Sequence, residues 1–106
     1  MKDSIRQKLA LLTDRLGEID LLLSAPETAG DMDQFRRLTR ERSEVEPVVL
    51  NYQAFCQCEQ DLAAAEGLRG DPEMRDFAEE EIAACKARLP ALELELQKLL
   101  LPRDPN

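Results

Sequence analysis

Apolar residues in the last third of the chain recur in alternating steps of four and three positions. The series is Ala78, Ile82, Cys85, Leu89, Leu92, Leu96 and Leu99. This spacing places every member on one face of an α-helix and is typical of a heptad seam that packs against another helix. A half-buried β-strand would instead need alternation with a period of two. The pattern therefore predicts a long amphipathic helix over about residues 72–100, with at least one helical partner.

A second apolar stripe, near the start of the chain, predicts an N-terminal helix over about residues 4–24. Its members follow the same steps and are Ile5, Leu9, Leu12, Leu16, Ile19 and Leu23. We expect Asp3 or Ser4 to cap this helix. The proline and glycine of the stretch SAPETAGD are helix-breaking signals, so we expect the helix to end near Ser24.

The middle of the chain predicts a longer helix over about residues 31–66. Asp31 is a suitable N-cap, and Gln34 three positions later completes a capping-box pattern. Pro47 lies inside this helix, where a proline removes a backbone hydrogen bond and costs about 3 kcal/mol. The apolar spacing continues on both sides of it, so we expect a kink at Pro47 and no break. The apolar positions are Phe35, Leu38, Val45, Val49, Tyr52, Phe55 and Leu62.

The connection between the two longer helices is short, because Asp71 is a cap and Pro72 suits the first position of the next helix. So short a loop makes the two helices antiparallel. Aromatic residues make up only 4% of the chain, which disfavours a sheet. The sequence therefore predicts an all-α fold: a long antiparallel, coiled-coil-like hairpin with the N-terminal helix packed along it. We expect residues 1–101 to form this domain and residues 102–106, which contain two prolines, to begin a linker.

The chain offers few groups for catalysis or metal binding. It contains no histidine, so the commonest general base and the commonest metal ligand are both missing. Cys56 and Cys58 point about 200° apart on a helix, and Cys85 lies on the seam as a small apolar residue. The consecutive glutamates of FAEEEIA fan out around the helix and do not converge. We therefore expect no catalytic residue, no metal site and no bound cofactor.

The charge of the chain also limits its partners. The formal net charge is −8, so contact with phosphates gains little counterion-release free energy, and strong independent nucleic-acid binding is not expected. No apolar run approaches the roughly 20 residues of a transmembrane helix. The N-terminus has no signal-peptide pattern, and the three cysteines have no disulfide-framework spacing. These features favour a cytoplasmic protein without a membrane partner.

One basic stretch, FRRLTRER, stands out against the acidic background. Its arginines are Arg36, Arg37, Arg40 and Arg42. One interpretation is pairing within the helix, of Asp33 with Arg37, Arg37 with Glu41, Arg40 with Glu44 and Arg42 with Glu46. The other interpretation is a contact surface for an outside partner. Exposed pairs are worth only tenths of a kcal/mol, so the first interpretation does not exclude the second.

The stretch DPEMRDFAEEEIAACKARLPALELELQKLLLPRDPN resembles the end of the N-terminal helical domain of the bacterial peptide chain release factor 1 family. The stretches SIRQKLALLTDRLGEIDLLLSAPE and FRRLTRERSEVEPVV also resemble that family, so the resemblance covers essentially the whole chain. Ala25, Pro90 and the cysteines depart from its pattern. In the family, the DPN segment leads into further domains, which read the stop codon and carry a Gly-Gly-Gln loop. Neither of those motifs occurs in this sequence.

The resemblance implies an accessory domain of a factor that directs translation termination at UAA and UAG. It also implies docking on the ribosome near the stalk base of the large subunit, with no catalysis by this chain. On this view Arg36, Arg37, Arg40 and Arg42 are candidate ribosome contacts, and the isolated domain self-associates at most weakly. The alternative from another class is a free-standing acidic coiled-coil adaptor, and a small enzyme is a third hypothesis.

Overall fold

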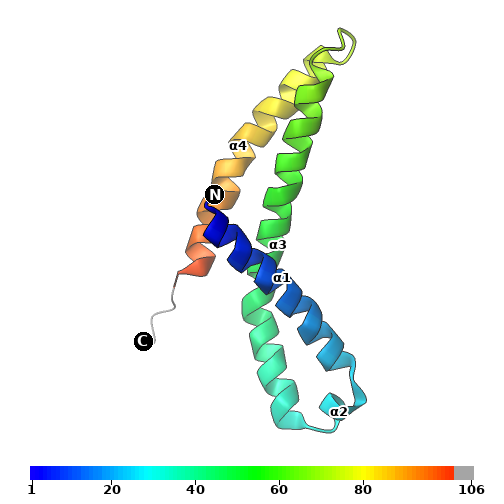
Figure 1. The fold of residues 1–106 in the computed structure, drawn as a ribbon, viewed down its shortest axis with the longest axis vertical. Coiled ribbons are helices and arrows are strands. Elements are labelled where there is room, and N and C mark those ends of the chain that lie inside the picture. The colour runs from blue at the N-terminus through cyan, green and yellow to red at the C-terminus, as the bar shows by residue number, and fades with distance from the viewer. Residues whose placement is uncertain (102–106) are drawn as a thin grey trace. The chain divides into compact units, whose positions relative to one another are not determined.

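The computed structural model describes residues 1–101, and every regular element in that range is an α-helix. The helices are α1 (Asp3–Ser24), α2 (Pro26–Ala29), α3 (Met32–Leu68) and α4 (Arg75–Leu100), as Figure 1 shows. The predicted all-α fold is confirmed. The expected linker at residues 102–106 lies outside the described residues. Two compact units share the chain, and the boundary between them falls inside α3, after Leu50.

The first unit is a helical hairpin made by α1 and the part of α3 that precedes Asn51, with α2 in the connection (Figure 1). The apolar stripes predicted for both helices supply its buried residues. Leu9 and Ile19 of α1 are fully buried, and the stripe of α3 is buried at Leu38, Val45 and Val49. The N-terminal helix therefore lies along the first half of α3, antiparallel to it.

The short helix α2 was not expected, because its sequence reads as helix-breaking. Ala25 is extended, with φ −75° and ψ 137°, and this ends α1 at Ser24 as predicted. Pro26 then occupies the first position of α2, where its missing N–H is harmless and its fixed φ favours a helical turn. Thr28 of this turn is buried. The same proline thus ends one helix and begins another.

The two predicted N-caps have different outcomes. Asp31 Oδ1 accepts a hydrogen bond from the Gln34 backbone N–H at 3.1 Å, which confirms the cap of α3. The backbone N–H of Asp31 donates to the Thr28 carbonyl at 3.0 Å. At α1 the prediction was wrong, because Lys2 is the N-cap residue and makes no side-chain cap. Asp3 instead lies in the first turn, where its charge favours the helix dipole.

Helix α3 continues through Pro47, so the predicted continuity is confirmed, and the bend at this residue stays a prediction.

Two ends of helices differ from expectation. Helix α3 extends to Leu68, past Gly67. Helix α4 begins at Arg75 and not near Pro72. The reason is a turn built by Asp71, whose side chain accepts from the Glu73 N–H at 3.0 Å while its carbonyl accepts from the Met74 N–H at 3.0 Å.

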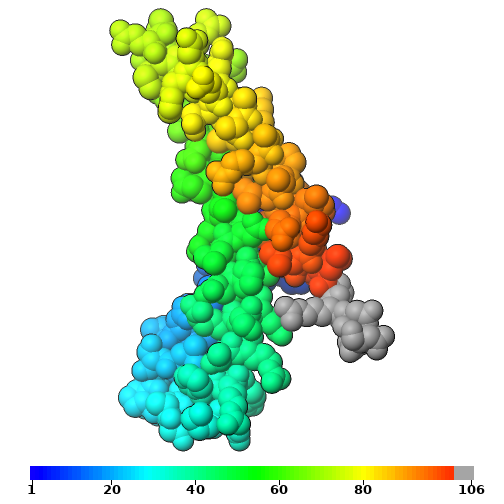
Figure 2. Space-filling model, turned by 180° about the vertical axis from the view of Figure 1, so that it is seen from behind, coloured from blue at the N-terminus to red at the C-terminus, as the bar shows by residue number. Residues whose placement is uncertain are grey.

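The second unit is the antiparallel hairpin of α3 from Asn51 onward with α4. Figure 2 shows α4, coloured yellow to orange, lying against the green part of α3 and joined to it by the yellow-green turn. The predicted heptad seam faces inward, since Ala78, Ile82, Cys85 and Leu96 are all buried. Opposite them, α3 contributes the buried Phe55, Cys58 and Ala65. Pro90 lies within α4, which is continuous around it.

Candidate functional site

Within the first unit, two ion pairs join α1 to the start of α3 beside the candidate arginines. Arg15 donates two parallel hydrogen bonds to Glu41, from Nε to Oε2 at 2.6 Å and from Nη2 to Oε1 at 2.7 Å. Its Nη1 also donates to Glu18 Oε1 at 2.8 Å. The hydrogen bond from Arg15 lowers the pKa of Glu41 below its ordinary value, although partial burial opposes this shift. This bidentate geometry fixes both side chains and holds α1 against α3.

The second of these pairs uses Arg42, which sequence reasoning placed among the possible ribosome contacts. Arg42 Nε donates to Asp20 Oδ1 at 2.7 Å, and Arg42 Nη1 lies 2.6 Å from Glu46 Oε2. The hydrogen bond to Asp20 raises the pKa of Arg42, and the charges of both carboxylates add to this effect. The predicted pair of Arg42 with Glu46 is confirmed. Two carboxylates therefore hold the Arg42 guanidinium, and the bond to Asp20 joins α3 to α1.

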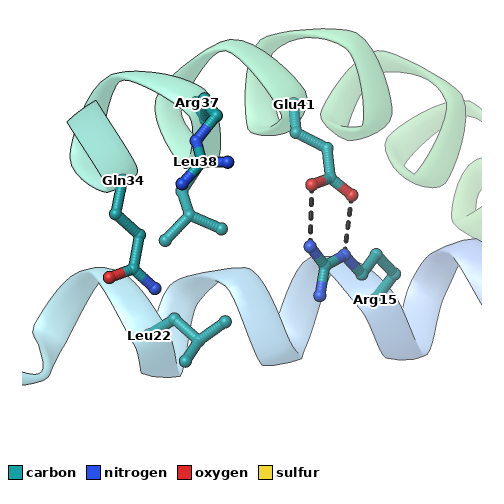
Figure 3. Close-up of a pocket in the computed structure, with 6 residues that line it drawn as sticks. All are labelled: Arg15, Leu22, Gln34, Arg37, Leu38 and Glu41. Atoms are coloured by element: carbon teal, nitrogen blue, oxygen red, sulfur yellow. Dashed lines mark hydrogen bonds and ion pairs between the residues drawn. The ribbon is translucent and has the colours of Figure 1, made fainter. Parts of the chain in front are cut away.

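The predicted pairing of Arg37 with Glu41 is wrong, because Glu41 binds Arg15 instead. Arg37 is exposed at the edge of a hollow of about 280 Å³ between α1 and α3. Figure 3 shows that Gln34 and Leu38 face Leu22 of α1 across this hollow, with the Arg15–Glu41 pair at its far end. For residues 1–101 the structure gives no ion pair to Arg37.

A separate hollow of about 350 Å³ lies on the surface of α3, and it contains the two remaining arginines. Its lining residues are Phe35, Arg36, Thr39, Arg40 and Ser43, and we call them the Phe35 patch. Arg36 and Arg40 are exposed, one helical turn apart. Within the described part of the chain neither has an ion pair. The four candidate arginines are therefore not one site: Arg36 and Arg40 share a surface, Arg37 borders another hollow, and Arg42 is paired.

Phe35 is the member of this patch that sequence reasoning assigned wrongly. The apolar pattern placed it in the buried stripe of the helix, yet 39% of the residue is exposed. At the start of α3 it is Gln34 and Leu38 that face α1, which leaves Phe35 outside (Figure 3). Its position directly before Arg36 in the sequence was the available signal, since an aromatic ring beside arginines is common at binding surfaces.

The cysteines contribute to packing. Cys58 and Cys85 are buried across the seam of the second unit, and the Cys58 thiol donates to the Cys85 carbonyl at a sulfur–oxygen distance of 3.6 Å. Burial raises the pKa of the Cys85 thiol, with a further contribution from its hydrogen bond with Cys58. Cys56 is half-buried, and all three thiols are free. Over residues 1–101, no cluster of three or more potential metal ligands occurs.

No helix within residues 1–101 is both long enough and apolar enough to cross a membrane. The sequence profile of the PCRF domain family matches residues 12–106. The chain therefore belongs to the PCRF domain family. Among the proteins that it resembles is peptide chain release factor 1 of Burkholderia multivorans, with 51% identity over 106 residues. The alignment covers 100% of this chain and 29% of that relative, so the chain spans less than a third of the relative's length. The resemblance seen in the sequence is confirmed.

Proposed function

We propose that this chain is the helical accessory domain of a peptide chain release factor and acts in translation termination on the ribosome. The observation that carries this proposal is the 51% identity to peptide chain release factor 1, which extends over the full chain. A shared packing motif alone would give similarity confined to the apolar seams. Here the family profile also includes the loops and the exposed basic stretch, within residues 12–106.

In this proposal the domain docks and positions the factor, and the chemistry belongs to other parts of it. Docking is near the stalk base of the large subunit, the stop codons are UAA and UAG, and the compartment is the cytoplasm. The contact surface is formed by the exposed Arg36, Arg37 and Arg40. Arg42, the fourth candidate, helps to hold α3 against α1 through its hydrogen bond to Asp20. The absence of histidine and of a Gly-Gly-Gln motif in the sequence supports a role without catalysis.

A segment exchange tests the proposal. The matching segment of the Burkholderia multivorans factor is replaced by this chain, and release of a labelled peptide is measured on ribosomes paused at UAA. We expect the chimera to release peptide at a rate close to that of its parent. A factor with the segment deleted should bind ribosomes more weakly. This chain alone should release no peptide, because it has no group for the reaction.

The exchange also separates the proposal from its rival. A chimera that behaves like the deleted factor, despite a folded helical segment by circular dichroism, would overturn the docking role. The acidic coiled-coil adaptor would then be the better hypothesis. Peptide release by the isolated chain would instead overturn the assignment as a domain without catalysis.

A further inference from the structure

The Phe35 patch has a composition that packing does not explain. It combines an exposed aromatic ring with two exposed arginines around one hollow of about 350 Å³, on a chain whose formal net charge is −8. The exposed part of Phe35 contributes no hydrophobic stabilisation to the fold, because it stays in contact with water. Neither arginine has an ion pair among residues 1–101. The other arginines of this unit's interface, Arg15 and Arg42, are each held by two carboxylates.

The hydrogen bonds within the patch show which of its groups are available to a ligand. The Thr39 hydroxyl donates to the Phe35 carbonyl at 2.8 Å, and the Ser43 hydroxyl donates to the Arg40 carbonyl at 2.6 Å. Both hydroxyl hydrogens are thus used by the backbone of the same helix. The groups left for recognition are the two guanidinium heads and the exposed part of the phenyl ring.

We propose that the Phe35 patch binds a short stretch of unpaired RNA, with phosphates on Arg36 and Arg40 and a base stacked on Phe35. This inference deepens the proposed function and rests on it, because it specifies the ribosomal component that the surface takes. Guanidinium groups donate hydrogen bonds in the plane that phosphate oxygens accept bidentately. Stacking of a splayed base on an aromatic ring is the usual complement of such phosphate contacts in single-stranded RNA recognition.

The exposed aromatic ring favours this occupant over an acidic peptide segment. Carboxylates would satisfy the two arginines but would leave the phenyl ring beside them without a planar partner. Unpaired RNA supplies both a phosphate and a base face from each nucleotide. The contact is small, since at most two phosphates are neutralised, and the acidic remainder of the chain opposes any longer polyanion. The binding is therefore weak when isolated and useful when the rest of the factor holds the domain in place.

The salt dependence of binding gives a quantitative test. The probe is a fluorescein-labelled uridine 12-mer, and its anisotropy is titrated with the full 106-residue chain between about 20 and 200 mM salt. Two phosphate contacts on a single strand predict a slope of about −1.4 for log K against log salt concentration. Amide chemical shifts from NMR at each addition locate the contact, and we expect the largest changes at Phe35, Arg36 and Arg40.

Variants separate the two kinds of contact. The double variant R36A/R40A should lose at least about tenfold in affinity at low salt, and its salt slope should fall toward zero. Phe35→Ala should weaken binding about fivefold or more while leaving the slope unchanged, because stacking releases no counterions. The double variant R69A/R88A is the matched control: it removes two exposed arginines from outside the patch, and we expect affinity within about twofold of the parent chain.

Three results would overturn the inference. One is an oligoglutamate peptide that binds as tightly as the RNA with no effect of Phe35→Ala, since this would mark an acidic protein partner. Another is equal loss of affinity from R69A/R88A and from R36A/R40A, since this would mark diffuse electrostatic attraction to any exposed arginine. An active chimera together with absent RNA binding would sink the RNA inference and leave the termination role standing. RNA binding together with an inactive chimera would sink the termination role and leave the RNA inference standing.

Discussion

Arg15 and Glu41 lie 26 residues apart in the sequence and face each other through two hydrogen bonds of 2.6 and 2.7 Å. The pair joins the middle of α1 to the first half of α3. It also takes Glu41 away from Arg37, its expected partner one turn earlier in the same helix. Arg37 thereby keeps its guanidinium exposed at the mouth of the hollow in Figure 3. This tertiary ion pair thus leaves Arg37 as an exposed basic group on the surface of α3.

Replacement of Glu41 by Gln should lower the melting temperature modestly at neutral pH. The hydrogen bond from Arg15 holds the pKa of Glu41 below its ordinary value in the folded state. Such a shift stabilises the fold above the ordinary glutamate pKa of about 4.3, and this stability is lost as the pH falls through the folded pKa. The difference in melting temperature between the parent chain and Glu41→Gln should therefore be constant at neutral pH and shrink as the pH falls below about 4.3. Glu80→Gln, at an exposed position of α4, is the control and should follow the parent chain throughout.

Truncation of Ile19 should show that the N-terminal stripe is a true core. Ile19 is fully buried, so Ile19→Ala removes apolar contacts and leaves a cavity, at a cost of about 2–5 kcal/mol in the free energy of unfolding. Leu21 on the same helix is 76% exposed, and Leu21→Ala should change stability by less than about 0.5 kcal/mol. Urea denaturation followed by circular dichroism measures both. If Ile19→Ala fails to fold, Ile19→Val should still cost about 0.5–1.5 kcal/mol. Equal effects at the two positions would contradict the assigned core.

Local signals predicted most of the helices, because caps and apolar steps act over a few residues. The end of α1 at Ser24 and the cap at Asp31 follow from such signals. The pairs Arg15–Glu41 and Arg42–Asp20 could not be predicted, since they form between helices whose rotation about their axes the sequence leaves open. The exposure of Phe35 has the same origin. The sequence therefore places the candidate arginines on one helix, but tertiary contacts decide which of them are exposed and which are paired.

Replacement by alanine should change the stability of the chain in opposite directions at two prolines that occupy different helical positions. Pro47 lies in the interior of α3, where it leaves the Ser43 carbonyl without its usual donor, so Pro47→Ala should stabilise the chain by about 2 kcal/mol. Pro26 occupies the first turn of α2, where its ring favours the observed conformation. Pro26→Ala should therefore cost about 0.5 kcal/mol. Thermal and urea denaturation check both values. A destabilised Pro47→Ala variant would mean that the proline makes contacts worth more than the lost hydrogen bond.

The cysteines should differ in their reactivity toward a thiol reagent. Cys58 and Cys85 are buried against each other's helices, and burial raises the pKa of Cys85, so little of its reactive thiolate is present near pH 8. Cys56 is only half-buried. A disulfide reagent should therefore modify Cys56 first, and the other two should react only as fast as the hairpin opens. The control Cys56→Ser should remove the fast phase alone, and guanidinium should make every thiol reactive. Three equal fast rates in the native chain would contradict the packed seam.

Substitution of the candidate arginines should affect the stability of the fold differently at Arg42 than at Arg36 and Arg40. Arg42 is held by Asp20 at 2.7 Å and by Glu46 at 2.6 Å, so Arg42→Ala leaves two carboxylates without their partner and should lower the melting temperature. Arg36 and Arg40 are exposed and have no ion pair in the described part of the chain, so R36A/R40A should change stability by less than about 0.5 kcal/mol. In a complete factor that carries this domain, the double variant should nevertheless weaken ribosome association, most strongly at low salt where screening is least. Arg42→Lys tests the geometry further, because one ammonium cannot reproduce the fixed fork that reaches both carboxylates. A double variant that melts early but binds ribosomes normally would assign these two arginines to the fold and remove them from the contact surface.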